Sequence, residues 1–210
     1  MYDDVSALSS MQMDALREIG NIGAGSSATA LSQIVGKRIE MNVPRVSIVE
    51  LTDVPDLVGG PDVMTCGVFL RVYGKAPSNI LFLTPIDSAF YLVDMLMGKP
   101  RGETQKSYEQ NGITAMEESA LIEIGNILSG AYLNALFNFT QIALLPSVPA
   151  LCMDMAGAIL SVVLIQLGQM GDHALVLETE FETDEEGIKG HFFLVPDPGS
   201  METILSAVGV

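Results

Sequence analysis

Tryptophan is absent, and the chain of 210 residues has only two cysteines and two histidines. Cys66 and Cys152 stand 86 positions apart, with no CxxC motif and no histidine cluster nearby. This spacing argues against a structural zinc site and favours two buried, reduced thiols over a disulfide. His173 and His191 are too isolated for a His-rich metal site. We therefore assign no metal to this chain.

Basic residues are also scarce, because 10 Lys and Arg stand against 26 Asp and Glu, for a net charge of −16. Such a surface repels phosphate backbones and anionic lipid headgroups, so neither nucleic acid nor a membrane surface is expected as a partner. The acidic start MYDDVSALSS is unlike an export signal. The longest apolar run, 155–167, is shorter than the roughly 18 residues of a spanning helix. We expect a cytoplasmic protein without a membrane span.

An internal repeat divides the chain into two halves. Residues 14–25 read DALREIGNIGAG, and 105 residues later residues 119–130 read SALIEIGNILSG, with EIGNI identical in both. Pro44 recurs as Pro149 at the same offset. We predict a single domain over 1–210, built from repeats of about 1–98 and 112–210. The polar segment 99–111 is predicted to be the connecting loop.

Each half has the same predicted plan of a long helix, an extended stretch, two further strands and a closing helix. In the first half these are about 10–35, 39–51, 66–74, 79–84 and 86–97. In the second half they are about 114–138, 141–151, 173–182, 190–195 and 199–208. The predicted fold class is α/β, with helices packed on one pseudo-two-fold duplicated sheet.

The halves differ at one place, where the first has the Pro-broken segment DVPDLVGG and the second has the apolar run that follows Asp154. Residues 156–165 are apolar nearly all round. Two interpretations stay open for this helix, a place in the core and a groove for a partner protein.

The repeated helix is amphipathic, with a polar stripe that recurs in both copies. At about 100° per residue the stripe of the first copy holds Asp14, Glu18, Asn21, Gly25 and Ser32, and that of the second holds Ser119, Glu123, Asn126 and Gly130. The opposite, inward side holds Leu16, Ile19, Gly20, Gly23, Ser27, Leu31 and Ile34 in the first copy, and Leu121, Ile124, Gly125 and Leu128 in the second.

Solvation alone does not explain this stripe, because Asn and Gly both weaken a helix interior. Gly20 and Gly125 are expected to let the helices or the sheet approach closely. Gly25 and Gly130 lie on the exposed stripe, where they would leave room for the backbone of another protein. The stripe predicts a docking face with a carboxylate and an amide three residues apart.

No nucleophile–base pair accompanies this face, since Ser26 and Ser27 have no histidine at a plausible spacing. An Asn amide can still orient a water molecule, which can suffice for phosphoryl transfer. The segment GAGSSA (23–28) matches a dinucleotide fingerprint, but it lies within a helical pattern and does not follow a strand. The GKR at 36–38 is a predicted helix stop and not a P-loop.

The pattern [DS]-x-x-x-E-x-x-N, present as Asp14–Glu18–Asn21 and as Ser119–Glu123–Asn126, resembles the signature of the CheC family of chemotaxis phosphatases. The stretches VPRVSIVEL, PSVPALCMDM and LVPDPGS are similar to that family too. The related CheX and FliY proteins belong to the same superfamily.

The resemblance implies a phosphatase that hydrolyses the aspartyl phosphate of a CheY-type response regulator, which brings its own Mg²⁺. Glu18 and Glu123 would anchor the partner, and Asn21 and Asn126 would hold the attacking water. Asp14, Ser119, Gly25 and Gly130 would support docking.

The resemblance also implies a second partner, the receptor deamidase CheD, on a surface at about 153–169. The alternative function is therefore a non-catalytic module of the same fold that binds CheD or the flagellar switch.

Overall fold

A computed structural model describes residues 8–167, 173–183 and 187–209 of the chain. The elements of the first half are α1 (Ser10–Val35), β1 (Ile39–Glu50), a 3₁₀ turn (Leu51–Asp53), α2 (Val54–Leu57), β2 (Met64–Gly74), β3 (Ser78–Pro85) and α3 (Ile86–Leu96). After α4 (Glu103–Asn111) come α5 (Ala115–Thr140), β4 (Leu144–Pro146), β5 (Ala150–Met155), α6 (Ala156–Leu167), β6 (His173–Thr183), β7 (Gly187–Pro196) and α7 (Ser200–Val208).

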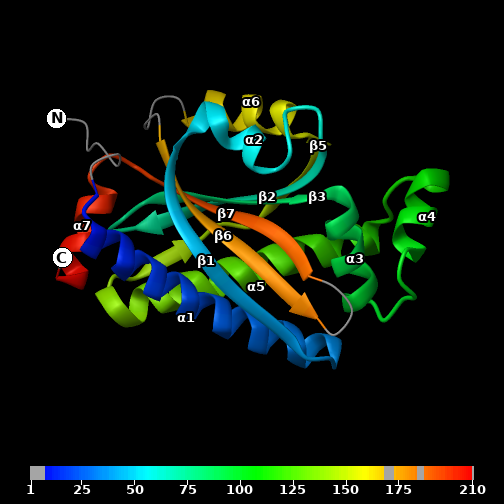
Figure 1. Cartoon of the computed structure of the whole chain (residues 1–210), viewed down its shortest axis with the longest axis horizontal. Helices are drawn as coiled ribbons and strands as arrows, with labels where there is room; N and C mark the ends of the chain where they lie inside the picture. Colours follow the sequence, from blue (N-terminus) through cyan, green and yellow to red (C-terminus); the bar gives the residue numbers. More distant parts are fainter. Residues whose placement is uncertain (1–7, 168–172, 184–186, 210) are drawn as a thin grey trace.

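One antiparallel sheet of seven strands forms the middle of the molecule (Figure 1). Its order is β1-β6-β7-β3-β2-β4, with β5 also paired to β2. The central pair, β7 and β3, joins the two halves. Outside this pair, strands of one half again pair with strands of the other. β1 of the first half pairs with β6 of the second, and β5 of the second half pairs with β2 of the first. The predicted duplicated sheet covered by helices is confirmed.

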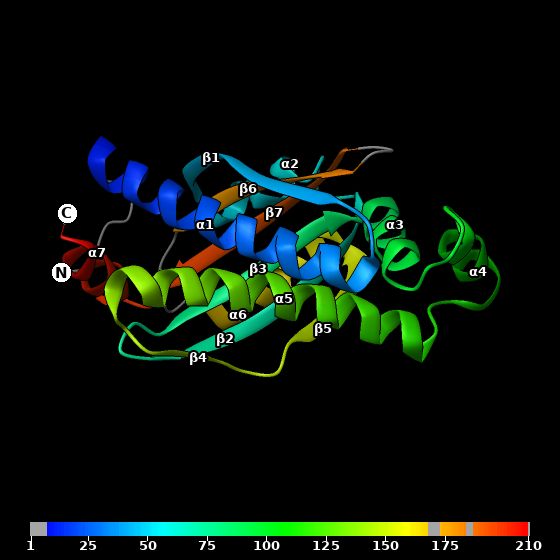
Figure 2. The ribbon, with the colours of Figure 1, turned by 90° about the horizontal axis from the view of Figure 1, so that it is seen from below.

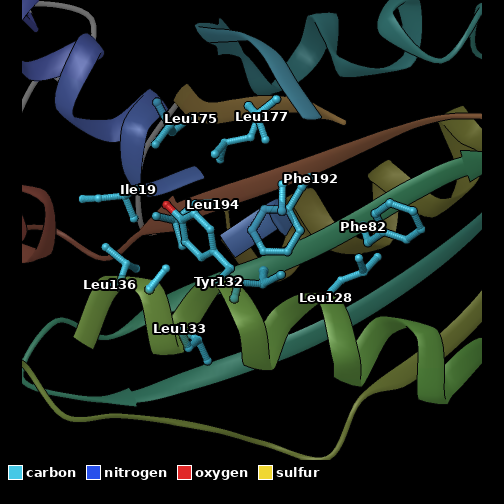
Figure 3. Close-up of a cluster of buried hydrophobic side chains, with 14 of the residues drawn as sticks. Ile19, Phe82, Leu128, Tyr132, Leu133, Leu136, Leu175, Leu177, Phe192 and Leu194 are labelled. Atoms are coloured by element: carbon cyan, nitrogen blue, oxygen red, sulfur yellow. The ribbon is translucent and has the colours of Figure 1, made fainter. Parts of the chain in front are cut away.

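Helices cover both faces of the sheet. The long helices α1 and α5 pack side by side on one face, and α2 and α6 lie on the other (Figures 1 and 2). Figure 3 shows the larger core, in which side chains of α5 such as Leu128 and Tyr132 meet Phe192 of β7. The Tyr132 and Phe192 rings lie 4.9 Å apart between centroids. A second core fills the space beneath α2 and α6.

The two long helices have equal length because their ends are built alike. Each begins with a capping box, in which Ser9 or Thr114 accepts the N–H of the residue three positions later and that residue's side chain accepts the cap's N–H. Each ends at a residue in the left-handed conformation, Gly36 with φ 71° and Gln141 with φ 55°. Both helices span 26 residues, and their caps share the 105-residue offset.

The connecting segment 99–111 is not the loop that its composition suggested, because residues 103–111 form α4. The buried Asp94 carboxylate accepts the N–H groups of Gly102 at 2.7 Å and Thr104 at 2.9 Å, which fixes the start of this helix. The Lys99 ammonium donates to the buried Glu117 carboxylate at 2.7 Å and ties the segment to α5. The two carboxylates that accept these bonds, of Asp94 and Glu117, lie outside the segment, so its own composition does not predict the helix.

The apolar run after Asp154 forms α6, and its inward face belongs to the core. Ile159 and Leu160 are 3% and 2% exposed and pack in the cluster that also holds Val54 and Val58 near α2. The Pro-broken segment of the first half and the apolar run of the second thus cover the same face of the sheet. Val162, on the outward side of α6, is 59% exposed.

The cysteine prediction is half right. Both thiols are free, but only Cys66 is buried, and Cys152 is exposed. They lie on the neighbouring strands β2 and β5, where Cys66 pairs with Met153 and Gly67 with Cys152, so the two side chains point to opposite faces of the sheet. Burial raises the pKa of the Cys66 thiol to about 12.

Helix α5 is the one helix among the described residues that is long and apolar enough to cross a membrane. However, 56% of its most apolar stretch of 18 residues is buried inside the protein, as in the core helix of a globular domain.

On α1, two predicted positions differ from the structure. Ile34, expected inside, is 52% exposed, and Ser32, expected outside, is half-buried.

Candidate functional site

Both Glu–Asn pairs lie on exposed surface at equivalent positions of α1 and α5. Glu18, Asn21, Glu123 and Asn126 are all exposed, as the helical stripe predicts. In the second pair the Asn126 amide donates to Glu123 Oε2 at 3.5 Å. We call Glu18 and Asn21 with their surroundings the first site, and Glu123 and Asn126 with theirs the second site.

Two glycines set the distance between each helix and the sheet. A methyl group at Gly20 would lie 2.5 Å from Leu177 Cδ2 of β6, and one at Gly125 would lie 2.4 Å from Val68 Cγ1 of β2. At Gly125 the clash would include Val68 Cβ, whereas at Gly20 it would involve only the end of the Leu177 side chain, which can shift. At both positions side chains of the sheet contact the helix backbone. The predicted close approach of Gly20 and Gly125 is therefore present at both positions.

The stripe glycines have the opposite environment. A Cβ atom at Gly25 or Gly130 would meet no heavy atom within 4 Å. Each glycine lies one helical turn beyond its Asn, and Gly25 is exposed whereas Gly130 is half-buried. Among the residues that the structure describes, no neighbour requires glycine at these two positions.

The outermost residues of the motif are engaged locally. Asp14 accepts from Arg17 Nη2 at 2.8 Å, in an exposed ion pair. The Ser119 hydroxyl donates to the carbonyl of Ala115 at 2.8 Å. An exposed pair of this kind contributes little to stability, so Asp14 can change partners at small cost.

A β-bulge stands beside each helix at the same place in the repeat. In β1, Asn42 pairs with Glu180 and Arg45 with Glu178, so Val43 and Pro44 together face one residue of β6. After β4, the N–H of Ser147 donates to the Arg71 carbonyl at 2.7 Å, and Ala150 pairs with Phe69. Val148 and Pro149 therefore face Leu70 alone. Bulges are common next to functional sites.

The two bulges differ in what they present. In the first site the N–H of Val43 donates to Asn21 Oδ1 at 3.1 Å, and the Val43 side chain is 4% exposed. In the second site the described residues show no such bond from Val148 to Asn126, and the Val148 side chain is 88% exposed. The sequence interpretation missed these residues, although the recurrence of Pro44 and Pro149 within extended stretches is a signal for bulges.

The chemistry available on this face is that of carboxylates and amides. No group of three His, Cys, Asp or Glu side chains able to hold a metal occurs among the described residues. The Ser26 and Ser27 hydroxyls donate to the carbonyls of Ile22 and Gly23 within their own helix. An exposed Asn amide can donate and accept hydrogen bonds at once, which allows it to orient a water molecule.

The sequence profile of the CheC-like family matches residues 11–48 and 116–153, two segments 105 residues apart that contain both Glu–Asn pairs and both bulges. The CheY-P phosphatase CheC of Bacillus subtilis is 39% identical over 200 residues, which cover 94% of each chain. The chain belongs to the CheC-like family.

One further relative in sequence and one solved structure are also similar to this chain. The flagellar motor switch phosphatase FliY of B. subtilis is 30% identical over 133 residues, covering 60% of this chain and 34% of FliY. The crystal structure of FliY from Thermotoga maritima superposes with a TM-score of 0.76 at 21% identity, over 97% of this chain and 98% of that one. The CheC-like fold is thus shared beyond clear sequence similarity.

Proposed function

We propose that this chain is a phosphatase that hydrolyses the aspartyl phosphate of a phosphorylated CheY-type response regulator, with one site on each long helix. The observation that carries the proposal is the display of an exposed Glu–Asn pair at equivalent positions of α1 and α5. A relative that shares nearly the whole chain is named a CheY-P phosphatase, which supports the same reaction.

In this mechanism each Asn positions the hydrolytic water and each Glu anchors the partner. Asn21 keeps the capacity for this role, because its Oδ1 has a second lone pair and its Nδ2 has two hydrogens besides the bond from Val43. Catalysis of phosphoryl transfer depends mainly on positioning and electrostatics, so an oriented water can suffice. The Mg²⁺ ion is supplied by the regulator in this proposal.

The remaining motif residues serve docking. Asp14 and Ser119 stand one turn before the Glu of each pair, and Gly25 and Gly130 stand one turn after the Asn. The empty space over both glycines suits the approach of a partner's backbone. The regulator would thus lie along the stripe, over the exposed side of the helix.

The test is phosphate release from a phosphorylated CheY-type receiver domain in the presence of Mg²⁺. We expect the double variant Asn21→Ala with Asn126→Ala to release phosphate no faster than the receiver does alone. The fold should be retained, because both side chains are exposed. Asn138→Ala, which removes another exposed amide of α5, is the matched control and should keep full activity. Wild-type rates in the double variant would rule out the proposed roles of both amides.

The second candidate function is binding of the deamidase CheD on the outward face of α6. Val162 of α6 is 59% exposed, and α6 lies on the opposite side of the sheet from the helices that carry the Glu–Asn pairs. Residues 168 and 169 of the segment 153–169 lie outside the described residues. Because the two surfaces are separate, a protein of this fold can act both as an enzyme and as a binding module. A cytoplasmic location, where such partners work, is part of this proposal.

A further inference from the structure

The two bulges have the same place in the repeat, although their side chains differ in exposure. In the first half Gly20 contacts Leu177, which pairs with Val46, three residues after Val43. In the second half Gly125 contacts Val68, which pairs with Leu151, three residues after Val148. By this frame Val148 has the place in the second half that Val43 has beside Asn21 in the first.

The valine at this position of the repeat is buried in the first half, as Val43, but not in the second half, as Val148. Both methyl groups of Val43 lie 3.6 Å from the position of a Cβ on Gly20, so the side chain is tucked under α1. Val148 has the same place in the repeat but is 88% exposed. An exposed valine beside a candidate catalytic amide is therefore a property of the second site and not a requirement of the duplicated fold.

A second apolar side chain extends the polar stripe of α5. From Asn126 the steps of four, four and three residues lead through Gly130 and Asn134 to Phe137, which is 42% exposed. Its equivalent in the first half is Ser32, whose hydroxyl is bound to both the N–H and the carbonyl of Ile39. The first site thus has no apolar side chain at this position.

Both side chains fall within the area that a docked protein covers. Phe137 lies about 16 Å from Asn126 along the helix axis, at 1.5 Å per residue. A typical protein interface covers about 800 Å² per partner, which is roughly 30 Å across. A receiver centred on Asn126 therefore reaches Phe137 at its edge, and we infer that it also covers Val148 from the place of this residue in the repeat.

We propose that Val148 and Phe137 form an apolar rim that contacts the phosphorylated receiver at the second site and makes that site bind the receiver more tightly than the first. This inference rests on the proposed phosphatase function. The occupant is the receiver because the rim continues the stripe that carries Glu123 and Asn126, and any protein that delivers a phosphate to Asn126 covers it. The rim acts through binding and takes no part in the chemical step.

The experiment isolates each site before it changes the rim. Asn21→Ala leaves only the second site active, and Asn126→Ala leaves only the first. In each background Val148→Ser is compared with its matched control Val162→Ser, which alters an exposed valine on the opposite face of the sheet. The readouts are KM and kcat for phosphate release from the phosphorylated receiver, and the oligomeric state of each variant in solution.

With only the second site active, we expect Val148→Ser to raise KM by about three- to tenfold and to leave kcat unchanged, because it removes contact area that is buried in both ground and transition states. With only the first site active it should change neither constant. Phe137→Ser should act in the same direction with a smaller effect, as expected at an interface edge.

Three outcomes would overturn the rim. One is an unchanged KM in the second-site background, another is an equal rise in both backgrounds, and the third is a change from dimer to monomer, which would assign Val148 to contact with a second copy. If neither single-site background releases phosphate faster than the receiver alone, the proposed function itself is wrong, and that result is distinct from a failure of the rim.

Discussion

Replacing the glycines of α5 one at a time separates those that serve the fold from those that serve a partner. Gly125 and Gly130 lie five residues apart on the same helix, and only Gly125 contacts the sheet. In a helix interior, glycine is about 1 kcal/mol less favourable than alanine. Alanine should therefore stabilise the helix at both positions unless its methyl group meets another atom.

The structure gives opposite results for the two positions. At Gly130 the methyl group meets nothing within 4 Å, so Gly130→Ala should stabilise the protein by about 0.5–1 kcal/mol. At Gly125 the new Cβ would lie 2.4 Å from Val68 Cγ1 and 2.9 Å from Val68 Cβ, a clash that a rotamer change cannot relieve. Overpacking of this kind costs about 1–3 kcal/mol, which exceeds the helix gain.

Thermal unfolding of the two variants beside wild type is the assay. For a domain of this size about 1 kcal/mol shifts Tm by roughly 2–4 °C, so Gly130→Ala should melt above wild type and Gly125→Ala below it. A Gly130→Ala variant that melts below wild type would refute the placement of this glycine in open space.

The same position tests docking when the new side chain is larger. Gly130→Leu in the Asn21→Ala background should fold normally and lose most of its phosphatase activity, because leucine would stand where the receiver approaches Asn126. Gly25→Leu in that background is the matched control and should have no effect, since the first site is already inactive. Full activity of the Gly130→Leu variant would contradict the docking geometry.

Two further predictions concern the connecting segment and the outward face of α6. Burial would raise the pKa of Glu117, but the bonds from Lys99 and Thr114 outweigh it and hold the pKa below its usual range. The stability that this ionised group contributes is present above about pH 4.3 and is lost as the pH falls through the lower folded-state pKa. In urea unfolding at pH 7, Glu117→Gln should therefore be about 1–3 kcal/mol less stable than wild type, and the difference should shrink below pH 4. An equal difference at every pH would exclude the charge as its cause. On α6, Val162→Asp should abolish CheD binding in a pull-down and leave phosphatase activity unchanged, whereas Ile159→Asp should unfold the protein because Ile159 is 3% exposed. Retained CheD binding in Val162→Asp would remove this face from the proposal.

The sequence predicted most of the local structure because the repeat supplied two independent views of each element. The bounds of α1 were predicted as they are observed, and the polar stripe correctly placed Glu18, Asn21, Glu123 and Asn126 on the surface. Helical stripes of this kind are set by residues three or four positions apart, so they can be recognised from the sequence alone.

The misses have causes that lie far away in the sequence. Helix α4 has a polar composition without apolar periodicity, and it starts where the buried Asp94 carboxylate holds the N–H groups of Gly102 and Thr104. Cys152 is exposed because β5 pairs with β2 in a register that turns its side chain away from that of Cys66. Pairing partners and registers of this kind are set by tertiary contacts, which local patterns do not record.

Strand exchange between the halves makes each candidate site a joint product of both. Helix α1 packs through Gly20 onto Leu177, and the bulge that bonds Asn21 belongs to a strand held in the sheet by β6, which is also a strand of the second half. The second site depends in the same way on β2 of the first half, through Val68 and the pairing with β5. Neither repeat can therefore build its own site alone, because the strand that supports it lies in the other repeat. Duplication within one chain thus leaves each surface free to change while the shared sheet keeps both amides in place, and the exposure of Val148 where Val43 is buried is such a change.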